Sequence, residues 1–221
     1  MPFGTLCIAK PSGTIKMNEL QLWADPWLIA IVVYLILIGL TFIPVVLALL
    51  KKVQLYPGGD SFDKSINFSD LAKEKLKQHY SRINGTLIFW KNKAEWHRRF
   101  HFYTLGWTIP VSILIPVITQ YIDTNIASRI FLTIISSHSA LLIAFHRALK
   151  IENNFKAFRH GESEFYDLYR RLLDRPKTFG ETEETQLENY FKEVDFIRRS
   201  VRLAETDNFP MIDEIKEKTS S

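Results

Sequence analysis

The stretch TIISSHSALL, residues 133–142, lies in a segment that is otherwise typical of a membrane span. That segment has 17 residues, 130–146, without Asp, Glu, Lys or Arg, and Arg129 and Arg147 bracket it. A helix needs roughly 17 to 25 apolar residues to cross a hydrocarbon core of about 30 Å. His138 stands nine residues from each arginine, at the expected midplane. Titratable side chains at that depth face other helices or aqueous cavities, so we expect His138 to point inward and never toward lipid.

Two further segments are typical of membrane helices. Residues 26–50, PWLIAIVVYLILIGLTFIPVVLALL, contain no charged residue or histidine over 25 positions, and residues 102–122, FYTLGWTIPVSILIPVITQYI, contain none over 21. The first segment is too long for the apolar core of a signal peptide, and Met17 is an alternative translation start. Only six residues, 123–128, separate the second span from Arg129. The second and third spans are therefore predicted to form a tight helical hairpin.

Lysine and arginine are distributed unevenly between the spans. Residues 51–101 hold 11 of them and residues 147–221 hold 14, whereas residues 1–25 hold 2 and residues 123–129 hold 1. Segments rich in Lys and Arg stay on the cytoplasmic side of a membrane. We therefore expect a multi-pass protein of the cell (inner) membrane with its N-terminus outside and its C-terminus in the cytoplasm.

Apolar residues outside the spans recur at alternating spacings of three and four, which is typical of the buried seam between packed helices. Before the second span the row is Tyr80, Ile83, Leu87, Trp90, Ala94, His97 and His101. After the third span it is Ile151, Phe155, Phe158, Glu162, Phe165, Tyr169 and Leu172. A last helix places Leu187, Tyr190, Val194, Ile197 and Val201 on one face. These rows predict a cytoplasmic helical bundle.

The predicted fold is all-α: an integral membrane protein with three transmembrane helices, whose second and third spans form a hairpin that extends into the cytoplasmic bundle. Its segments are an N-terminal tail at 1–25, a first span at 26–50, a linker at 51–66, a helix at 67–101, a second span at 102–122, a third span at 130–146, helices at 147–175 and 182–206, and a C-terminal tail at 207–221.

Small polar residues recur along both arms of the hairpin. They are Thr104, Thr108, Ser112 and Thr119 on the second span, and Thr133, Ser136, Ser137 and His138 on the third. Small residues let helices approach closely, and hydroxyls bond across helices or back to their own backbone. The rows therefore fit either tight packing of the hairpin or the lining of a pore in an oligomer. A neutral His138 could bond a hydroxyl of Thr108 or Ser112, or could act in gating or proton relay.

Basic residues and histidines mark the inner border of the spans. Arg98, Arg99, Arg147 and Lys150 are expected to contact anionic lipid headgroups. His97 and His101 are four residues apart, and His146 ends the third span at the same level. Imidazoles so placed could hold zinc, but no carboxylate joins them, so we predict no metal site.

The sequence contains no nucleophile elbow, Walker loop, HExxH motif or paired carboxylates. We therefore predict a protein that is not an enzyme and has no cofactor. Its net charge of +4 is too small to indicate a nucleic-acid partner. Cys7 is the only cysteine, which excludes an intrachain disulfide.

A basic, aromatic-rich helix precedes the hairpin, YSRINGTLIFWKNKAEWHRRFHFY at 80–103, and ENNFKAFRHGESEFYDLYRRLL at 152–173 follows it. This layout resembles the SLATT domains, two-transmembrane bacterial effector modules that accompany nucleotide-second-messenger synthetases. The resemblance covers about residues 67–206 and includes the Phe165-Tyr166 and Tyr169-Arg170 pattern. It implies a pore-forming effector of the bacterial cell membrane. The extra span at 26–50 also leaves room for a housekeeping channel or regulator.

Two functions of different classes follow from these patterns. The first is a homo-oligomer in which the hairpins surround a pathway for ions. The alternative is a structural or regulatory membrane subunit that conducts nothing and docks a cytoplasmic protein partner through its basic helical bundle. Both include membrane lipids as partners.

Overall fold

The computed structural model describes residues 25–50, 55, 62–122 and 125–207, and that part of the chain is all-α. Its helices are α2 (Pro26–Leu50), α3 (Asp70–Gln120), α4 (Ile126–Ala148), α5 (Ile151–Asp174) and α6 (Glu183–Asp207), with short 3-10 turns η1 (Phe62–Lys64) and η2 (Pro176–Phe179). Cys7, nearly all of the predicted N-terminal tail, most of the linker and the C-terminal tail after residue 207 lie outside the described residues.

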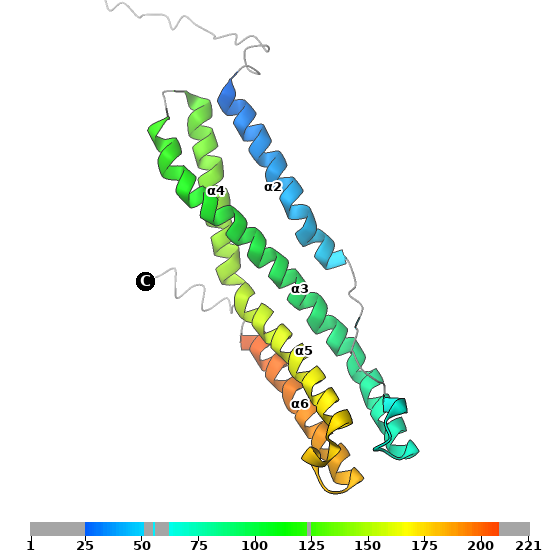
Figure 1. The fold of residues 1–221 in the computed structure, drawn as a ribbon. Coiled ribbons are helices and arrows are strands. Elements are labelled where there is room, and N and C mark those ends of the chain that lie inside the picture. The colour runs from blue at the N-terminus through cyan, green and yellow to red at the C-terminus, as the bar shows by residue number, and fades with distance from the viewer. Residues whose placement is uncertain (1–24, 51–54, 56–61, 123–124, 208–221) are drawn as a thin grey trace, which may run out of the picture.

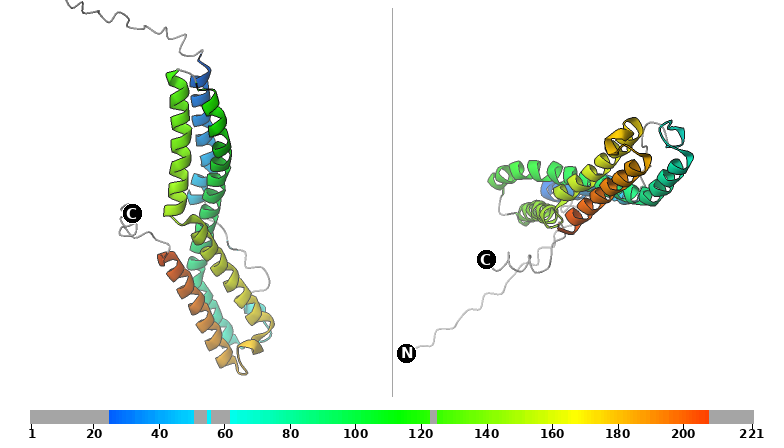
Figure 2. Two further views of the ribbon diagram at one scale, coloured as in Figure 1. Left: turned by 90° about the vertical axis from the view of Figure 1, so that its left-hand side faces the viewer. Right: turned by 90° about the horizontal axis from the view of Figure 1, so that it is seen from below.

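The helices form two three-helix bundles that are stacked end to end and share α3 (Figures 1 and 2). We call α2, α4 and residues 102–120 of α3 the membrane bundle, and residues 70–101 of α3 with α5 and α6 the distal bundle. Three helices, α2, α3 and α4, are long and apolar enough to cross a membrane. The chain therefore has the build of a multi-pass helical membrane protein, and the predicted hairpin of α3 and α4, extended into a helical bundle, is confirmed.

Helix α3 joins two predicted segments into one element. The helix expected at 67–101 and the span expected at 102–122 form a single helix of 51 residues that continues through Pro110 and Pro116. At about 1.5 Å per residue it is about 76 Å long, more than twice the roughly 30 Å of a hydrocarbon core. A membrane that contains one end of α3 therefore leaves the other end outside.

The rows of three- and four-residue spacing form the core of the distal bundle. The fully buried side chains include Ile83 and Leu87 of α3, Phe158 of α5, and Tyr190 and Val194 of α6. Two residues that sequence analysis did not place in this core also belong to it. Phe62, from the segment assigned to the linker, and Phe68 are both buried. Phe62 packs on Tyr169 with ring centroids 4.6 Å apart.

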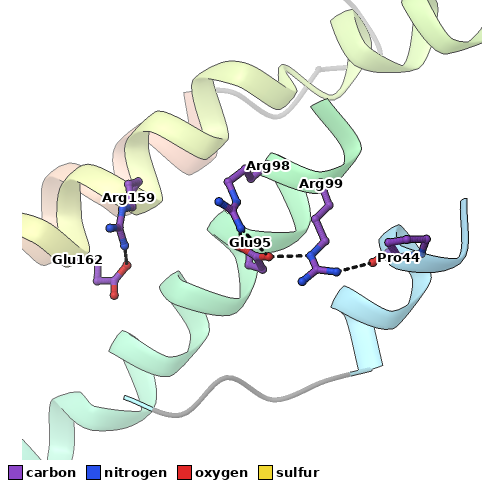
Figure 3. A network of polar contacts seen from close by, with 6 residues as sticks. All are labelled: Pro44, Glu95, Arg98, Arg99, Arg159 and Glu162. Atoms are coloured by element: carbon purple, nitrogen blue, oxygen red, sulfur yellow. Dashed lines mark hydrogen bonds and ion pairs between the residues drawn. The ribbon is translucent and has the colours of Figure 1, made fainter. Parts of the chain in front are cut away.

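One charged residue of the α5 row is buried with the apolar ones. Glu162 is only 4% exposed, and its carboxylate accepts a hydrogen bond from Arg159 at 2.7 Å (Figure 3). Lys91 of α3 lies 3.9 Å from the same carboxylate. A buried charge is tolerated where it is paired, so Glu162 keeps its place in the seam between α3 and α5.

The prediction of a helix from residue 147 implies that the third span continues into the next helix without a break. The structure instead separates the two helices by a turn. Helix α4 ends at Ala148, α5 begins at Ile151, and Lys150 between them has the left-handed conformation, φ 42° and ψ 47°. This conformation costs a non-glycine residue about 1–2 kcal/mol. Lys150 Nζ donates to the carbonyl of Asp207 at 2.7 Å, which ties the turn to the end of α6. The chain changes direction here (Figure 2), and Ile151 becomes fully buried.

The residues that directly precede α2 and α4 are hydrogen-bonded to each other at the far end of the membrane bundle. Asp25 Oδ1 accepts from the backbone N–H of Trp27, and Asn125 Oδ1 accepts from that of Ala127, each at 2.9 Å. Asn125 Nδ2 also donates to Asp25 Oδ2 at 2.8 Å. The hydrogen bond from Asn125 and those from the α2 backbone lower the pKa of Asp25. The two helices therefore start side by side and run in the same direction.

Candidate functional site

The three spans meet in a polar and aromatic cluster in the membrane bundle, to which each span contributes one ring. A hydrogen bond joins Tyr34 Oη of α2 to His138 Nδ1 of α4 at 2.9 Å. Trp107 of α3 lies against both, with ring centroids 5.2 Å from Tyr34 and 5.6 Å from His138. Trp107 Nε1 donates to Thr41 Oγ1 of α2 at 3.0 Å. We call Tyr34, Thr41, Trp107 and His138 the midspan cluster.

The inward direction of His138 was expected, but its partner was not. The sequence allows a bond to Thr108 or Ser112 on the neighbouring arm, but the hydrogen bond of His138 in the structure is to Tyr34. Thr108 donates to the Thr104 carbonyl at 2.8 Å, and Ser112 donates to the Thr108 carbonyl at 2.6 Å. Hydroxyls in helices commonly bond the carbonyl four residues back, which uses their proton. His138 bonds Tyr34 instead, a residue of the first span that is not part of the predicted polar rows.

The predicted polar residues of the two spans, His138 included, fall into three groups by exposure. Thr104 and Thr108 are buried within the membrane bundle. Ser136 and His138 are half-buried. The remainder are exposed, namely Ser112, Thr119, Thr133 and Ser137. Thr119 and Thr133 also donate to carbonyls of their own helices, at 2.7 and 2.9 Å.

The exposed polar residues of α4 belong to a row of small side chains. Thr133, Ser137, Ala140 and Ala144 are all exposed and follow one another at spacings of four, three and four. Positions so spaced lie on one face of a helix. His138 is one residue beyond Ser137 and so points about 100° away around the helix. Helix α4 therefore turns His138 toward α2 and presents this row, which we call the α4 outer face, away from its own bundle.

Arginines at the border between the membrane bundle and the distal bundle form a network with α2 (Figure 3). Arg99 Nε donates to Glu95 Oε1 at 2.7 Å, and Arg98 Nη2 lies 2.8 Å from Glu95 Oε2. Arg99 Nη1 also donates to the Pro44 carbonyl of α2 at 3.3 Å. Burial raises the pKa of Glu95, but the hydrogen bonds from both arginines outweigh it and leave the pKa below its ordinary value. Glu95 thus stays ionised and fixes the two guanidinium groups beside the end of α2.

The other two predicted interface residues lie at the end of the other arm of the hairpin and in the turn that follows it. Arg147 is exposed in the last turn of α4. Lys150 occupies the left-handed turn and is bonded to the carbonyl of Asp207. Both are at the level where the membrane bundle gives way to the distal bundle.

The three histidines considered for zinc do not converge. His101 Nδ1 and His146 Nε2 are 2.8 Å apart, whereas His97 Nδ1 donates to the carbonyl of Lys93 at 2.7 Å. Burial lowers the pKa of His97, and the charge of Lys93 lowers it further. Within residues 25–50, 55, 62–122 and 125–207, no three His, Cys, Asp or Glu side chains gather as metal ligands do.

The arrangement holds three spans together through polar contacts at membrane depth and turns a small polar face outward. It defines a class, the multi-pass helical membrane proteins with a long extramembrane bundle. Comparison with protein families, with curated proteins and with solved structures gives no match to this chain.

Proposed function

We propose that the chain assembles into a homo-oligomer through the α4 outer face and that the hairpins of the oligomer surround a pore for ions. The exposure of Thr133, Ser137, Ala140 and Ala144 at membrane depth carries this proposal. Small residues let a second helix approach closely, and hydroxyls at that contact bond across it or line water. The resemblance to the SLATT domains points to the same function.

The midspan cluster has a supporting role in this proposal. Because His138 bonds Tyr34, it faces α2 and not the α4 outer face. The cluster then braces α2 against the hairpin while Thr133 and Ser137 meet the neighbouring copy. We place the three spans in the cell (inner) membrane. The distribution of Lys and Arg supports an orientation in which the distal bundle lies in the cytoplasm.

Disulfide cross-linking in native membranes tests the assembly. In a Cys7→Ser background, Ser137→Cys should form a disulfide-linked dimer on mild oxidation. The matched control is Ile143→Cys, which is also exposed on α4 but lies about 100° or more from Ser137 around the helix. Equal cross-linking of the two variants, or none at Ser137, would exclude the α4 outer face as the contact.

Ion flux through liposomes tests conduction separately. The purified chain should pass ions, and Ser137→Leu should lower the flux because its larger side chain prevents the close approach of neighbouring α4 helices on which the oligomer depends. Ile143→Ser adds a hydroxyl away from the α4 outer face and should leave the flux unchanged. If liposomes pass no ion at any voltage while Ser137→Cys still cross-links, the result supports the homo-oligomer and excludes the ion pore.

A second candidate is the non-conducting subunit that docks a cytoplasmic protein. It is favoured by Phe196 and Leu203 of α6, which are 71% and 62% exposed although they lie outside the predicted spans. Residues seven apart share a helix face, and exposed apolar patches mark protein contacts. Phe196→Glu should then release a stoichiometric partner that co-purifies with the chain. Leu71→Glu, an exposed position on α3, is the control and should retain it.

A further inference from the structure

An open groove of about 890 Å³ runs between α2 and α3 in the membrane bundle. Its walls are mainly apolar and include Leu37 of α2 and Phe102, Trp107 and Leu114 of α3, of which Leu37, Phe102 and Leu114 are exposed. Arg98 and Arg99 belong to the same lining. The groove therefore combines a long apolar surface with two guanidinium groups at one end.

The dimensions of the groove match one leaflet of a bilayer. Along α3 the lining extends from Arg98 to Leu114, which is about 24 Å at about 1.5 Å per residue. Its apolar part, from Phe102 to Leu114, is about 18 Å long. Half of the hydrocarbon core is about 15 Å deep. With Arg98 and Arg99 at the headgroup level, the apolar part of the groove covers the depth that an acyl chain occupies.

The charge at the groove end fits an anionic headgroup. Glu95 offsets one of the two positive charges, so the network keeps a net charge of +1. The side chains of Arg98 and Arg99 remain 51% and 41% exposed, which leaves donors free for a further ligand. Guanidinium groups bind phosphate in a forked geometry and are favoured for this role.

We propose that the groove is a binding site for one anionic diacyl phospholipid, with its phosphate on Arg98 and Arg99 and an acyl chain between α2 and α3. The lipid would complete the contact of α2 with the hairpin at the inner end. The Asp25–Asn125 hydrogen bond makes the equivalent contact at the outer end. The proposal is independent of conduction, since the groove lies on the α2 side of the hairpin and the α4 outer face points elsewhere.

Gly106 offers a way to fill the groove without disturbing the packing. It lines the groove, and a Cβ added to it would meet no atom within 4 Å. Gly106→Leu therefore projects a side chain into the space assigned to the acyl chain. Gly39 of α2 has equally open surroundings and does not line the groove, so Gly39→Leu adds the same side chain in a span as a matched control.

Native mass spectrometry of the full chain in detergent tests the site. The chain should retain one phosphatidylglycerol, and more of it than of phosphatidylcholine with the same acyl chains. Gly106→Leu should lower retention of both lipids, and Arg98→Gln should lower phosphatidylglycerol to the level of phosphatidylcholine. Gly39→Leu and Arg147→Gln should behave as the unchanged protein, and helical content by circular dichroism confirms that each variant is folded.

Three results would overturn the proposal. The unchanged chain could retain both lipids equally or retain neither, as it would if a second copy filled the groove. Gly106→Leu could retain as much lipid as Gly39→Leu. Arg98→Gln could keep the full preference for phosphatidylglycerol, which would show that Arg98 does not bind the lipid headgroup.

Discussion

Ile83 and Ile113 belong to the same helix, α3, yet Ile83 is 1% exposed in the distal bundle and Ile113 is 66% exposed in the membrane bundle. The pattern extends to their neighbours. The distal bundle buries large apolar side chains such as Phe158 and Tyr190, whereas the buried residues of the membrane bundle include Thr104 and Thr108.

The difference follows from what surrounds each bundle. In water, burying apolar area is worth about 25 cal/mol per Å², so the distal bundle turns its isoleucines and phenylalanines inward. Lipid tails are as apolar as a leucine side chain, so helices in a membrane associate through close packing and polar contacts instead. The bond between Tyr34 and His138 and the back-bonded threonines are contacts of that kind.

The largest expected difference is between Ile83→Ala and Ile113→Ala. Ile83→Ala should lower the free energy of unfolding of the distal bundle by about 2–5 kcal/mol, because it leaves a cavity in a packed core. Ile113→Ala should change stability little, because lipid or detergent fills the space. Urea unfolding in detergent, followed by circular dichroism, measures both. Equal losses for the two variants would mean that the bundles are not stabilised differently.

A second pair compares two glycines outside the spans. A Cβ on Gly161 of α5 would lie 2.3 Å from Val201 Cγ2 of α6, whereas a Cβ on Gly85 of α3 would meet nothing within 4 Å. Overpacking of a core costs about 1–3 kcal/mol, and replacing an exposed helical glycine by alanine gains up to about 1 kcal/mol. Gly161→Ala should therefore destabilise the distal bundle and Gly85→Ala should stabilise it, in the same urea experiment. If both variants have a higher free energy of unfolding, α6 can move at Val201 without a loss of stability.

The same contrast explains what the sequence predicted well. Rows spaced by three and four are informative where one helix face meets water, and the structure buries Ile83, Phe158 and Tyr190 as these rows require. In the first span every face is apolar, so no row indicates which side of α2 meets the hairpin. Tyr34 was missed for that reason, although a phenol within an uncharged span is itself a signal for a buried polar partner.

The break between α4 and α5 could not be predicted from local propensity either. Leu149 and Lys150 are good helix formers, and neither glycine nor proline marks the turn. Lys150 adopts its left-handed conformation in a turn that places Ile151 in the hydrophobic core and gives Lys150 a bond to Asp207. Tertiary contacts formed by distant residues override the local preference.

Two histidines should make the stability of the distal bundle depend on pH. Burial lowers the pKa of His79 and of His97 below the ordinary value for histidine. For His79, Asp195 acts against burial, and Arg198 and Arg82 act with it. The unfolded chain then binds protons at a higher pH than the folded one, so stability is complete above about pH 6.5 and falls as the pH is lowered through the folded pKa values.

Urea unfolding at about pH 7.5 and about pH 5.5 measures this loss. His79→Gln and His97→Gln should each reduce the difference between the two pH values. His160→Gln, at an exposed histidine of α5, is the matched control. If neither His79→Gln nor His97→Gln changes the pH dependence, the loss arises from other groups.

The smallest expected effect lies in the membrane bundle. Tyr34→Phe removes the hydroxyl that bonds His138 and leaves the ring contacts with Trp107 in place. Hydrogen bonds between membrane helices contribute on average only about 0.6 kcal/mol and at most about 1.7. Thermal unfolding in detergent should show a small loss for Tyr34→Phe. Tyr121→Phe, at an exposed tyrosine at the end of α3, should show none. A loss as large as that of Ile83→Ala would mean that the midspan cluster stabilises the membrane bundle as strongly as an apolar core stabilises the distal one.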